Sequence, residues 1–216
     1  DTMAATMNIE CYNTLTGFKY IAALMGKLEG KKRFIAAGEE SYGYMVGDFV
    51  RDKDAVSACA FFAAMAASST EENKSMYDWL IDMYVEFGFY KEHLLNLTRK
   101  GQQGEQEIKA MMQKFRNNPP AEIKGSRVVR ILDYKSLQEK DLASGTTSKL
   151  DFPVSDVLQF YLADGTKVSV RPSGTEPKIK FYIAVKTTLP SKNDFQAKNR
   201  ELDKRIKEIE DYLLNA

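Results

Sequence analysis

A short segment near the C-terminus, 171–177, reads Arg-Pro-Ser-Gly-Thr-Glu-Pro and has the composition of an anion-binding loop. Arg171 can offer a planar pair of charged donors to a phosphate group. Ser173 and Thr175 can each donate a hydroxyl hydrogen, and Gly174 lets backbone amides approach an oxyanion closely. A surface turn with an exposed arginine would contain the same residue types, so composition alone leaves both interpretations open.

A second candidate loop follows a short apolar run and reads Gly-Glu-Glu-Ser-Tyr-Gly at 38–43. Two carboxylates and a hydroxyl, on Glu39, Glu40 and Ser41, can accept hydrogen bonds from sugar hydroxyls, and one carboxylate accepts two at once. A solvated acidic turn is the alternative. A glycosidase role is excluded, because adjacent side chains on one loop do not flank a bond from opposite faces. Lys53 lies just downstream and could reach a sugar or phosphate oxygen, or form a salt bridge at a helix start.

Helices are expected to carry most of the first half of the chain. Apolar residues at intervals of three and four predict a helix over about 16–28, and the run at 33–37 predicts a strand that enters the acidic loop. Ser75 and Asp78 form a candidate capping box at a helix start. Further helices are predicted over three stretches, about 51–68, 75–88 and 104–116.

Strand patterns dominate after Asn117-Asn118-Pro119-Pro120, which is the expected boundary between two domains. Residues 163–166 read Ala-Asp-Gly-Thr, a hairpin turn with glycine where a positive φ is required. An amphipathic helix over 192–214 closes the chain. The second domain is therefore expected to be an antiparallel sheet covered by helices, with the phosphate-type loop between its last two strands. Strands are predicted at 127–132, 157–162, 167–171 and 178–186.

Composition argues against several classes of function. Lys and Arg number 31 against 30 Asp and Glu, so the chain has no long-range field that would concentrate nucleic acid. The longest apolar run, 55–67, is shorter than the roughly 18–20 residues of a membrane span and predicts a buried helix. His93 is the only histidine, which argues against a zinc site. Cys11 and Cys59 are expected to be buried free thiols.

Four motifs occur in the order seen in one enzyme family. They are Thr-Leu-Thr-Gly-Phe-Lys at 14–19, Gly-Glu-Glu-Ser-Tyr-Gly-Tyr at 38–44, Arg-Asp-Lys-Asp at 51–54 and the loop at 171–177. With them the chain resembles the α-D-phosphohexomutases, in the phosphoglucomutase/phosphomannomutase branch, over nearly its whole length. The resemblance implies an α/β plus α+β architecture. Residues 1–118 would form most of the third domain, an incomplete α/β sugar-binding domain, and residues 121–216 the fourth, a small antiparallel sheet covered by helices.

The resemblance also assigns roles to individual residues. In the third domain, the Glu-x-Ser motif would read sugar hydroxyls, a Thr-Gly turn would orient the substrate, and a lysine would lie near it. In the fourth domain, the loop would hold the phosphate farthest from the reaction. The substrate-binding residues implied in this way are Thr16, Glu39, Ser41, Lys53, Arg171, Ser173, Gly174 and Thr175.

The sugar itself is not fixed by these motifs. Many phosphomannomutase-like members have Gly-His after the Glu-x-Ser motif, where this chain has Tyr42 and Gly43. Glucose and mannose phosphates therefore both stay open as substrates, and so does a pentose phosphate, as in a phosphopentomutase of the same branch.

Members of this family interconvert hexose 1-phosphate and hexose 6-phosphate through an enzyme phosphoserine and a bisphosphate such as glucose 1,6-bisphosphate. The phosphoserine and the Asp-rich loop that binds Mg²⁺ belong to the first two domains, and no Asp-x-Asp-x-Asp cluster occurs in this sequence. The first residue is not Met, and the N-terminus lacks the basic and apolar stretches of a secretory signal. We therefore expect part of a longer cytoplasmic enzyme, with the N-terminal domains as its partner.

Such a part would have no catalytic residue and no metal ligand of its own, and it would be inactive alone. It would bind a small sugar phosphate, and neither nucleic acid nor a membrane. Two alternatives come from other classes: a sugar-phosphate-binding module that performs no catalysis, and a structural interaction domain in which the Arg171 loop is incidental.

Overall fold

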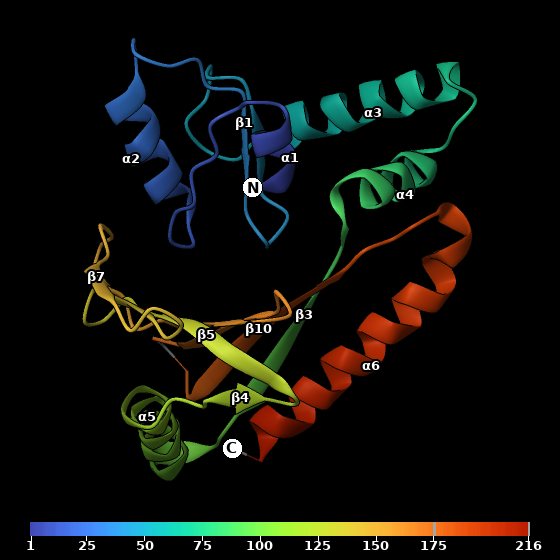
Figure 1. The fold of residues 1–216 in the computed structure, drawn as a ribbon. Helices are drawn as coiled ribbons and strands as arrows, with labels where there is room; N and C mark the ends of the chain where they lie inside the picture. The colour runs from blue at the N-terminus through green and yellow to red at the C-terminus, as the bar shows by residue number, and fades with distance from the viewer. Residues whose placement is uncertain (175, 216) are drawn as a thin grey trace. The chain divides into compact units, whose positions relative to one another are not determined.

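The computed structural model describes residues 1–174 and 176–215 and contains helices and antiparallel sheets in two compact units, Asp1–Met83 and Tyr84–Ala216 (Figure 1). This mixture of helices and sheets agrees with the predicted fold class. None of the helices in the described part of the chain is both long enough and apolar enough to cross a membrane.

The first unit combines helices with a short hairpin. The hairpin strands pair antiparallel, with Ala36 opposite Val46 and Gly38 opposite Tyr44. The predicted helix over 16–28 and the strand that enters the acidic loop are both present. The elements are α1 (Thr2–Thr6), α2 (Phe18–Leu28), β1 (Ala36–Gly38), β2 (Tyr44–Val46), α3 (Ala55–Glu71) and most of α4 (Met76–Phe87).

Side-chain caps fix where α3 and α4 begin. At α3, the Asp54 carboxylate accepts hydrogen bonds from the backbone amides of Val56 and Ser57, at 3.1 and 3.0 Å. At α4, the amide of Ser75 donates to Asp78 Oδ2 at 2.8 Å and the amide of Asp78 donates to Ser75 Oγ at 3.1 Å. The predicted capping box is therefore confirmed, and two amides that lack helical partners are satisfied reciprocally.

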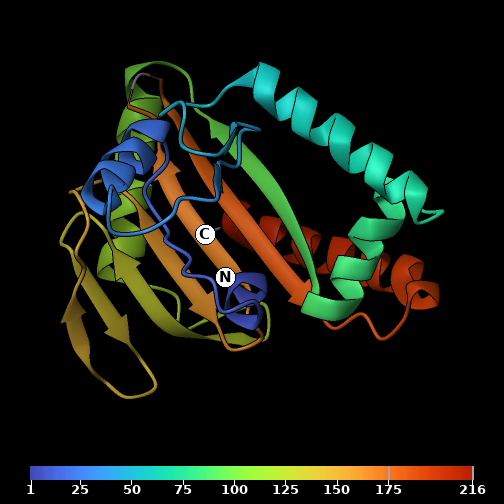
Figure 2. The same ribbon diagram turned by 90° about the horizontal axis from the view of Figure 1, so that it is seen from above.

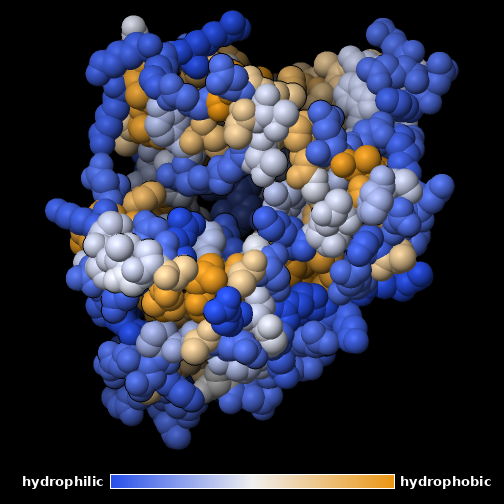
Figure 3. All heavy atoms as spheres, viewed as in Figure 1, coloured by the Kyte–Doolittle hydropathy of each residue, from blue (hydrophilic) through white to orange (hydrophobic). Residues whose placement is uncertain are grey.

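Helix α3 contains the apolar run that predicted a buried helix, but it is largely exposed. The exposed fractions of Val56 and Phe61 are 79% and 46%, and Figure 3 shows a light orange surface over this helix. Cys11 and Cys59 are free thiols, yet both are exposed, so the predicted burial is wrong for both. Apolar composition shows that a helix can be buried, but burial also requires a layer that covers it. Among the described residues, little besides strand β2 packs against α3.

The second unit is built on an eight-stranded antiparallel sheet (Figure 2). Its strand order is β3-β10-β9-β8-β5-β6-β7, and β4 pairs with β5. All four strands predicted for this region are present. The elements are β3 (Phe89–Thr98), α5 (Gly101–Asn117), β4 (Glu122–Ile123), β5 (Ser126–Asp133), β6 (Gln138–Asp141), β7 (Thr147–Lys149), β8 (Leu158–Leu162), β9 (Lys167–Pro172), β10 (Lys178–Thr187), the 3-10 helix η1 (Lys192–Asp194) and α6 (Phe195–Leu214).

Strand β3 explains why the two units divide at Met83 rather than at the break over 117–120. β3 pairs with β10 along its whole length, from Phe89 opposite Thr187 to Thr98 opposite Lys178. This ladder joins the segment after α4 to the end of the chain. Helix α5, which the sequence analysis placed before the boundary, therefore lies in the second unit and packs on β9 and β10.

The core of the second unit lies between the sheet and two helices. Alternate residues of β10, Ile179, Phe181 and Ile183, are at most 1% exposed. Helices α5 and α6 both pack on β10, and the Phe181 ring meets Phe115 of α5. The predicted apolar stripe of α6 is buried here, at Leu202, Ile206, Ile209 and Leu213. The opposite face of β10 carries half-buried side chains, among them Lys178, Lys180 and Tyr182.

The hairpin turn between β8 and β9 has the predicted glycine with a positive φ, at Gly165. The amide of Leu162 donates to Thr166 O, and the amide of Gly165 donates to Leu162 O, both at 2.9 Å. The Asp164 carboxylate accepts the amide hydrogen of Thr166 at 2.9 Å and pairs with Arg205 of α6 at 2.8 Å. This side chain therefore links the turn to the helix layer.

We expect acid to destabilise the second unit partly through Asp164. Burial acts to raise its pKa, but the hydrogen bonds from Thr166 and the charge of Arg205 outweigh burial and hold the pKa below its ordinary value. The stabilisation that the Asp164 carboxylate contributes is thus complete above the pKa of about 3.9 that an Asp has in the unfolded chain. It is lost as the pH falls through the lower pKa of the folded state. In urea titrations between about pH 6 and pH 2, Asp164→Asn should lose less unfolding free energy than the unmodified chain. Parallel profiles would contradict this.

Candidate functional site

The predicted sugar-reading loop is the turn of the β1–β2 hairpin. The amide of Glu39 donates to Gly43 O at 3.0 Å and the amide of Tyr42 donates to Glu39 O at 3.2 Å. Tyr42 has a φ of 66°, a conformation that non-glycine residues adopt rarely. The turn is therefore closed by its own backbone, and it presents Glu39 half-buried and Ser41 exposed.

Three segments of the first unit meet at Gly43, which is buried. A methyl group placed on Gly43 would lie within 3 Å of three atoms: Glu39 Oε1 at 2.7 Å, Lys53 Cδ at 2.8 Å and Phe18 Cε2 at 2.9 Å. The structure thus brings together two predicted site residues, Glu39 and Lys53. It adds Phe18 and Gly43, which the sequence analysis did not select as site residues.

The Lys53 side chain is exposed, and its Cδ atom lies at this meeting point. Its ammonium group lies 5.8 Å from the centroid of the Phe18 ring and 3.7 Å from Asp52 Oδ1. The pairing with Asp52 is long and solvent-exposed, so it restrains the ammonium weakly. A ligand hydroxyl or phosphate oxygen could therefore compete for this cation.

Thr16 and Ser41 are the other two substrate-binding residues predicted in the first unit. Thr16 is exposed and precedes Gly17, whose φ of 119° allows the turn into α2 at Phe18. Within the described residues, neither Thr16 nor Ser41 has a hydrogen bond to Glu39 or Lys53. Their predicted contacts with the sugar remain predictions.

The predicted phosphate loop joins β9 to β10 and is held at its base. The amide of Ser173 donates to Lys178 O at 2.8 Å, and the amide of Glu176 donates to Ser173 Oγ at 3.3 Å. The space beside Gly174 is open, with no atom within 4 Å of a methyl placed there. Thr175, the remaining predicted residue of this loop, lies outside the described residues.

Arg171 is exposed and lies directly opposite Lys180 of β10. Two like charges on paired strands are unfavourable unless an anion lies between them. Among residues 1–174 and 176–215, Arg171 forms no ion pair with a carboxylate, and the nearby Glu176 pairs with Lys178 instead. The hydrogen bond from Lys178 lowers the pKa of Glu176, and the charge of Lys180 adds to this effect. The positive charge at Arg171 is thus available to a ligand.

Lys180 was not predicted as a site residue, although the strand pattern of β10 indicates which face of the sheet it lies on. Buried residues alternate along β10, which places Lys180 on the face opposite Ile179 and Phe181. Because β9 and β10 join at the loop, the same alternation leaves Lys180 beside Arg171. Strand register was needed to make that connection.

A magnesium ion, which the family resemblance implies for the longer enzyme, does not fit the described residues of this chain. Residues 1–174 and 176–215 contain no group of three or more His, Cys, Asp or Glu side chains that could hold a metal ion.

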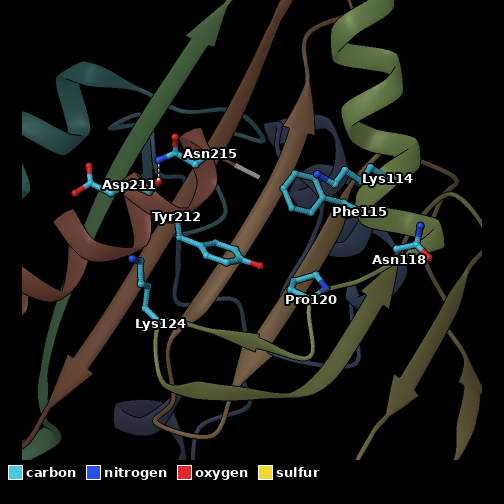
Figure 4. Close-up of a pocket in the computed structure, with 8 residues that line it drawn as sticks. All are labelled: Lys114, Phe115, Asn118, Pro120, Lys124, Asp211, Tyr212 and Asn215. Atoms are coloured by element: carbon cyan, nitrogen blue, oxygen red, sulfur yellow. Dashed lines mark hydrogen bonds between the residues drawn. The ribbon is translucent and has the colours of Figure 1, made fainter.

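A pocket in the second unit lies apart from all of these residues (Figure 4). It is formed at the C-terminal ends of α5 and α6 and beside β4. Its charged side chains have both signs, and none of its residues was predicted to bind substrate. The lining residues are Lys114, Phe115, Asn118, Pro120, Lys124, Asp211, Tyr212 and Asn215. We do not place the sugar phosphate here.

Comparison with known proteins assigns both parts of the chain to one family. Residues 1–87 match the family described as phosphoglucomutase/phosphomannomutase, alpha/beta/alpha domain III. Residues 94–202 match phosphoglucomutase/phosphomannomutase, C-terminal domain. The matched regions contain the two loops described above, one in each.

Relatives among characterised proteins are phosphoglucomutases. Over 185 residues the chain is 39% identical to the phosphoglucomutase of Staphylococcus aureus strain RF122, covering 86% of this chain and 33% of that protein. Over 183 residues it is 34% identical to that of Staphylococcus haemolyticus, covering 85% of this chain and 33% of the relative. The chain therefore spans about a third of the length of these relatives.

A solved structure has the same fold. It is the open form of the exocytosis-sensitive phosphoprotein pp63/parafusin, a phosphoglucomutase from Paramecium, with a TM-score of 0.58 and 19% identity over 89% of this chain and 32% of that one. At this identity the likeness concerns the fold alone. With the two matched domains and the Staphylococcus relatives, however, it leads to one assignment: the chain belongs to the phosphoglucomutase/phosphomannomutase family, of which it carries domain III and C-terminal domain sequence.

Proposed function

We propose that this chain supplies sugar and distal-phosphate recognition to an enzyme that interconverts hexose 1-phosphate and hexose 6-phosphate through a phosphoserine and a bisphosphate intermediate. The observation that carries the proposal is the pair of cations at Arg171 and Lys180, which face each other across β9 and β10 beside the Ser173 loop. The hairpin loop around Glu39, with the adjacent Lys53, supplies the sugar-reading groups in the other unit.

In this proposal these residues bind and orient the substrate. In such a mutase the sugar bisphosphate must turn round between the two phosphoryl transfers, so each end of the sugar occupies the distal position in turn. A guanidinium with a neighbouring ammonium recognises a dianion at either end of the sugar. A carboxylate accepts hydroxyl hydrogens in either orientation. Positioning of this kind accounts for much of the catalysis in phosphoryl transfer.

The phosphoryl-transfer groups belong, in this proposal, to other parts of a longer cytoplasmic protein. The proposal includes a phosphoserine and magnesium ligands there, and residues Glu39, Lys53 and Arg171 here. Hexose phosphates are the proposed substrates, with glucose and mannose not distinguished.

The chain should therefore bind a sugar bisphosphate without turning over a sugar phosphate. We expect nuclear magnetic resonance titration with glucose 1,6-bisphosphate to shift amide signals of the 39–43 turn and of the 173–178 loop. With glucose 1-phosphate, glucose 1,6-bisphosphate and Mg²⁺ present, the chain should form no glucose 6-phosphate. Parallel titrations with mannose and ribose phosphates rank the sugars.

Each result has a distinct consequence. A chain that binds none of these compounds overturns the proposal. A chain that binds them and also produces glucose 6-phosphate contradicts the placement of the phosphoserine elsewhere. A chain that binds inorganic phosphate as tightly as the bisphosphate contradicts the sugar-reading role of the hairpin loop.

A further inference from the structure

Gly43 is a position where glycine is required for space and not for backbone conformation. Its φ lies outside the left-handed region, so an L-residue meets no strain of that kind there. A side chain would instead collide with Glu39, Lys53 and Phe18, all closer than 3 Å to a methyl at this site. By contrast, Gly174 in the other loop has open space beside it. The same residue type thus serves different purposes in the two loops.

The three groups around Gly43 differ in their freedom to move. Phe18 is 6% exposed and stands at the start of α2, so its ring is fixed by packing. The Glu39 carboxylate and the Lys53 stem are the ends of flexible side chains, and Lys53 is exposed. A methyl on Gly43 would therefore displace the carboxylate and the lysine stem, and the ring would stay in place.

We propose that Gly43 and Phe18 are positioning residues, which together hold the Glu39 carboxylate and the Lys53 ammonium side by side for one sugar hydroxyl. Because Gly43 has no side chain, a Glu39 carboxylate oxygen, the Lys53 stem and the edge of the Phe18 ring can all lie around one point. The ring attracts the ammonium, which lies 5.8 Å from its centroid. This inference rests on the proposed function and adds to it how the sugar-reading groups are oriented.

The chemistry of the pair suits a hydroxyl and not a phosphate. A hydroxyl both donates and accepts, so it can donate to Glu39 while it accepts from Lys53. A phosphate dianion would be attracted by Lys53 and repelled by Glu39. The cluster therefore distinguishes the sugar from the anion that the Arg171 loop holds, and the two affinities can be tested separately.

The test compares Gly43→Ala with Gly26→Ala in the full chain. A methyl on Gly26, which lies within α2 of the same unit, would meet its nearest atom, Arg51 Nη1, at 3.7 Å, an ordinary contact. We expect Gly43→Ala to weaken glucose 1,6-bisphosphate binding about tenfold or more, as for loss of a charged hydrogen bond. Affinity for inorganic phosphate, and both affinities of Gly26→Ala, should stay unchanged.

A second pair of variants separates positioning from folding. Phe18→Leu should also lower affinity for the bisphosphate and leave affinity for inorganic phosphate intact. In the double variant with Gly43→Ala the smaller residue makes room for the methyl, so the double loss should be smaller than the product of the single losses. If Gly43→Ala does not fold, Phe18→Leu alone decides the question by the same two affinities.

The inference is overturned if Gly43→Ala and Phe18→Leu bind the bisphosphate as the unmodified chain does. Equal losses for the bisphosphate and for inorganic phosphate would also overturn it, because they would indicate general damage. Failure of the unmodified chain to bind any sugar phosphate would instead refute the proposed function. The two failures are therefore distinguishable.

Discussion

Replacing Arg171 with alanine is expected to weaken binding of glucose 1,6-bisphosphate by about 10- to 150-fold. This range corresponds to the roughly 1.5–3 kcal/mol contributed by a hydrogen bond to a charged group. Among the described residues no carboxylate pairs with Arg171, and its side chain is exposed, so its loss leaves no buried partner behind. Isothermal titration calorimetry would measure the change, with the urea midpoint expected to stay the same.

Arg127→Ala is the matched control for this experiment. Arg127 is likewise an exposed strand arginine of the second unit, on β5 opposite Glu122 of β4, and away from the 173–178 loop. Its removal should leave the affinity unchanged. The affinity of Arg171→Lys should lie between those of the unmodified chain and Arg171→Ala, because a lysine keeps the charge and loses the two-pronged geometry. Equal affinities of Arg171→Ala and Arg127→Ala would refute the role of the loop.

Replacing Phe181 with alanine should have the largest effect on stability. Phe181 is fully buried in the centre of β10 and meets Phe115 of α5 edge-on, with ring centroids 6.1 Å apart. Loss of such a ring costs about 3–5 kcal/mol, because the neighbours fill the cavity only in part. This is a large share of the roughly 5–15 kcal/mol that stabilises a typical domain. Urea unfolding followed by circular dichroism would show it.

Tyr182→Ala is the control for the packing argument. Tyr182 is the next residue of β10, and its half-buried side chain lies on the opposite face of the sheet, away from α5 and α6. We expect its replacement to cost clearly less than that of Phe181. Similar costs at both positions would contradict the assignment of the core to the helix-covered face.

The elements predicted well were those with a regular pattern and a local start signal. The alternation along β10 and the apolar stripe of α6 both reflect one buried face, which the sequence records directly. The capping box at Ser75 is likewise local in sequence. Strand β3 was not predicted, because at the sheet edge its burial does not alternate, and exposed Glu92, His93 and Leu94 follow one another.

For the candidate site, the sequence predicted which residue types take part, but not where segments remote in sequence meet. Glu39, Lys53 and Arg171 were selected because carboxylate, ammonium and guanidinium groups have known preferences for sugars and phosphates. The close approach of Phe18 to Gly43 depends on distances between segments remote in sequence, which periodicity does not record. The exposure of α3 has the same origin, since composition shows an apolar helix and not the layer that covers it.

The ladder between β3 and β10 has a consequence for synthesis on the ribosome. β3 is the first strand of the eight-stranded sheet to be made, and β10, its neighbour, is the last. Phe89 at the start of β3 stacks at 5.1 Å on Phe195, which emerges later still. A nascent chain must therefore keep β3 without this neighbour until β10, about 80 residues later in the sequence, has also been translated. Such distant pairing slows folding and gives chaperones time to engage the unpaired strand.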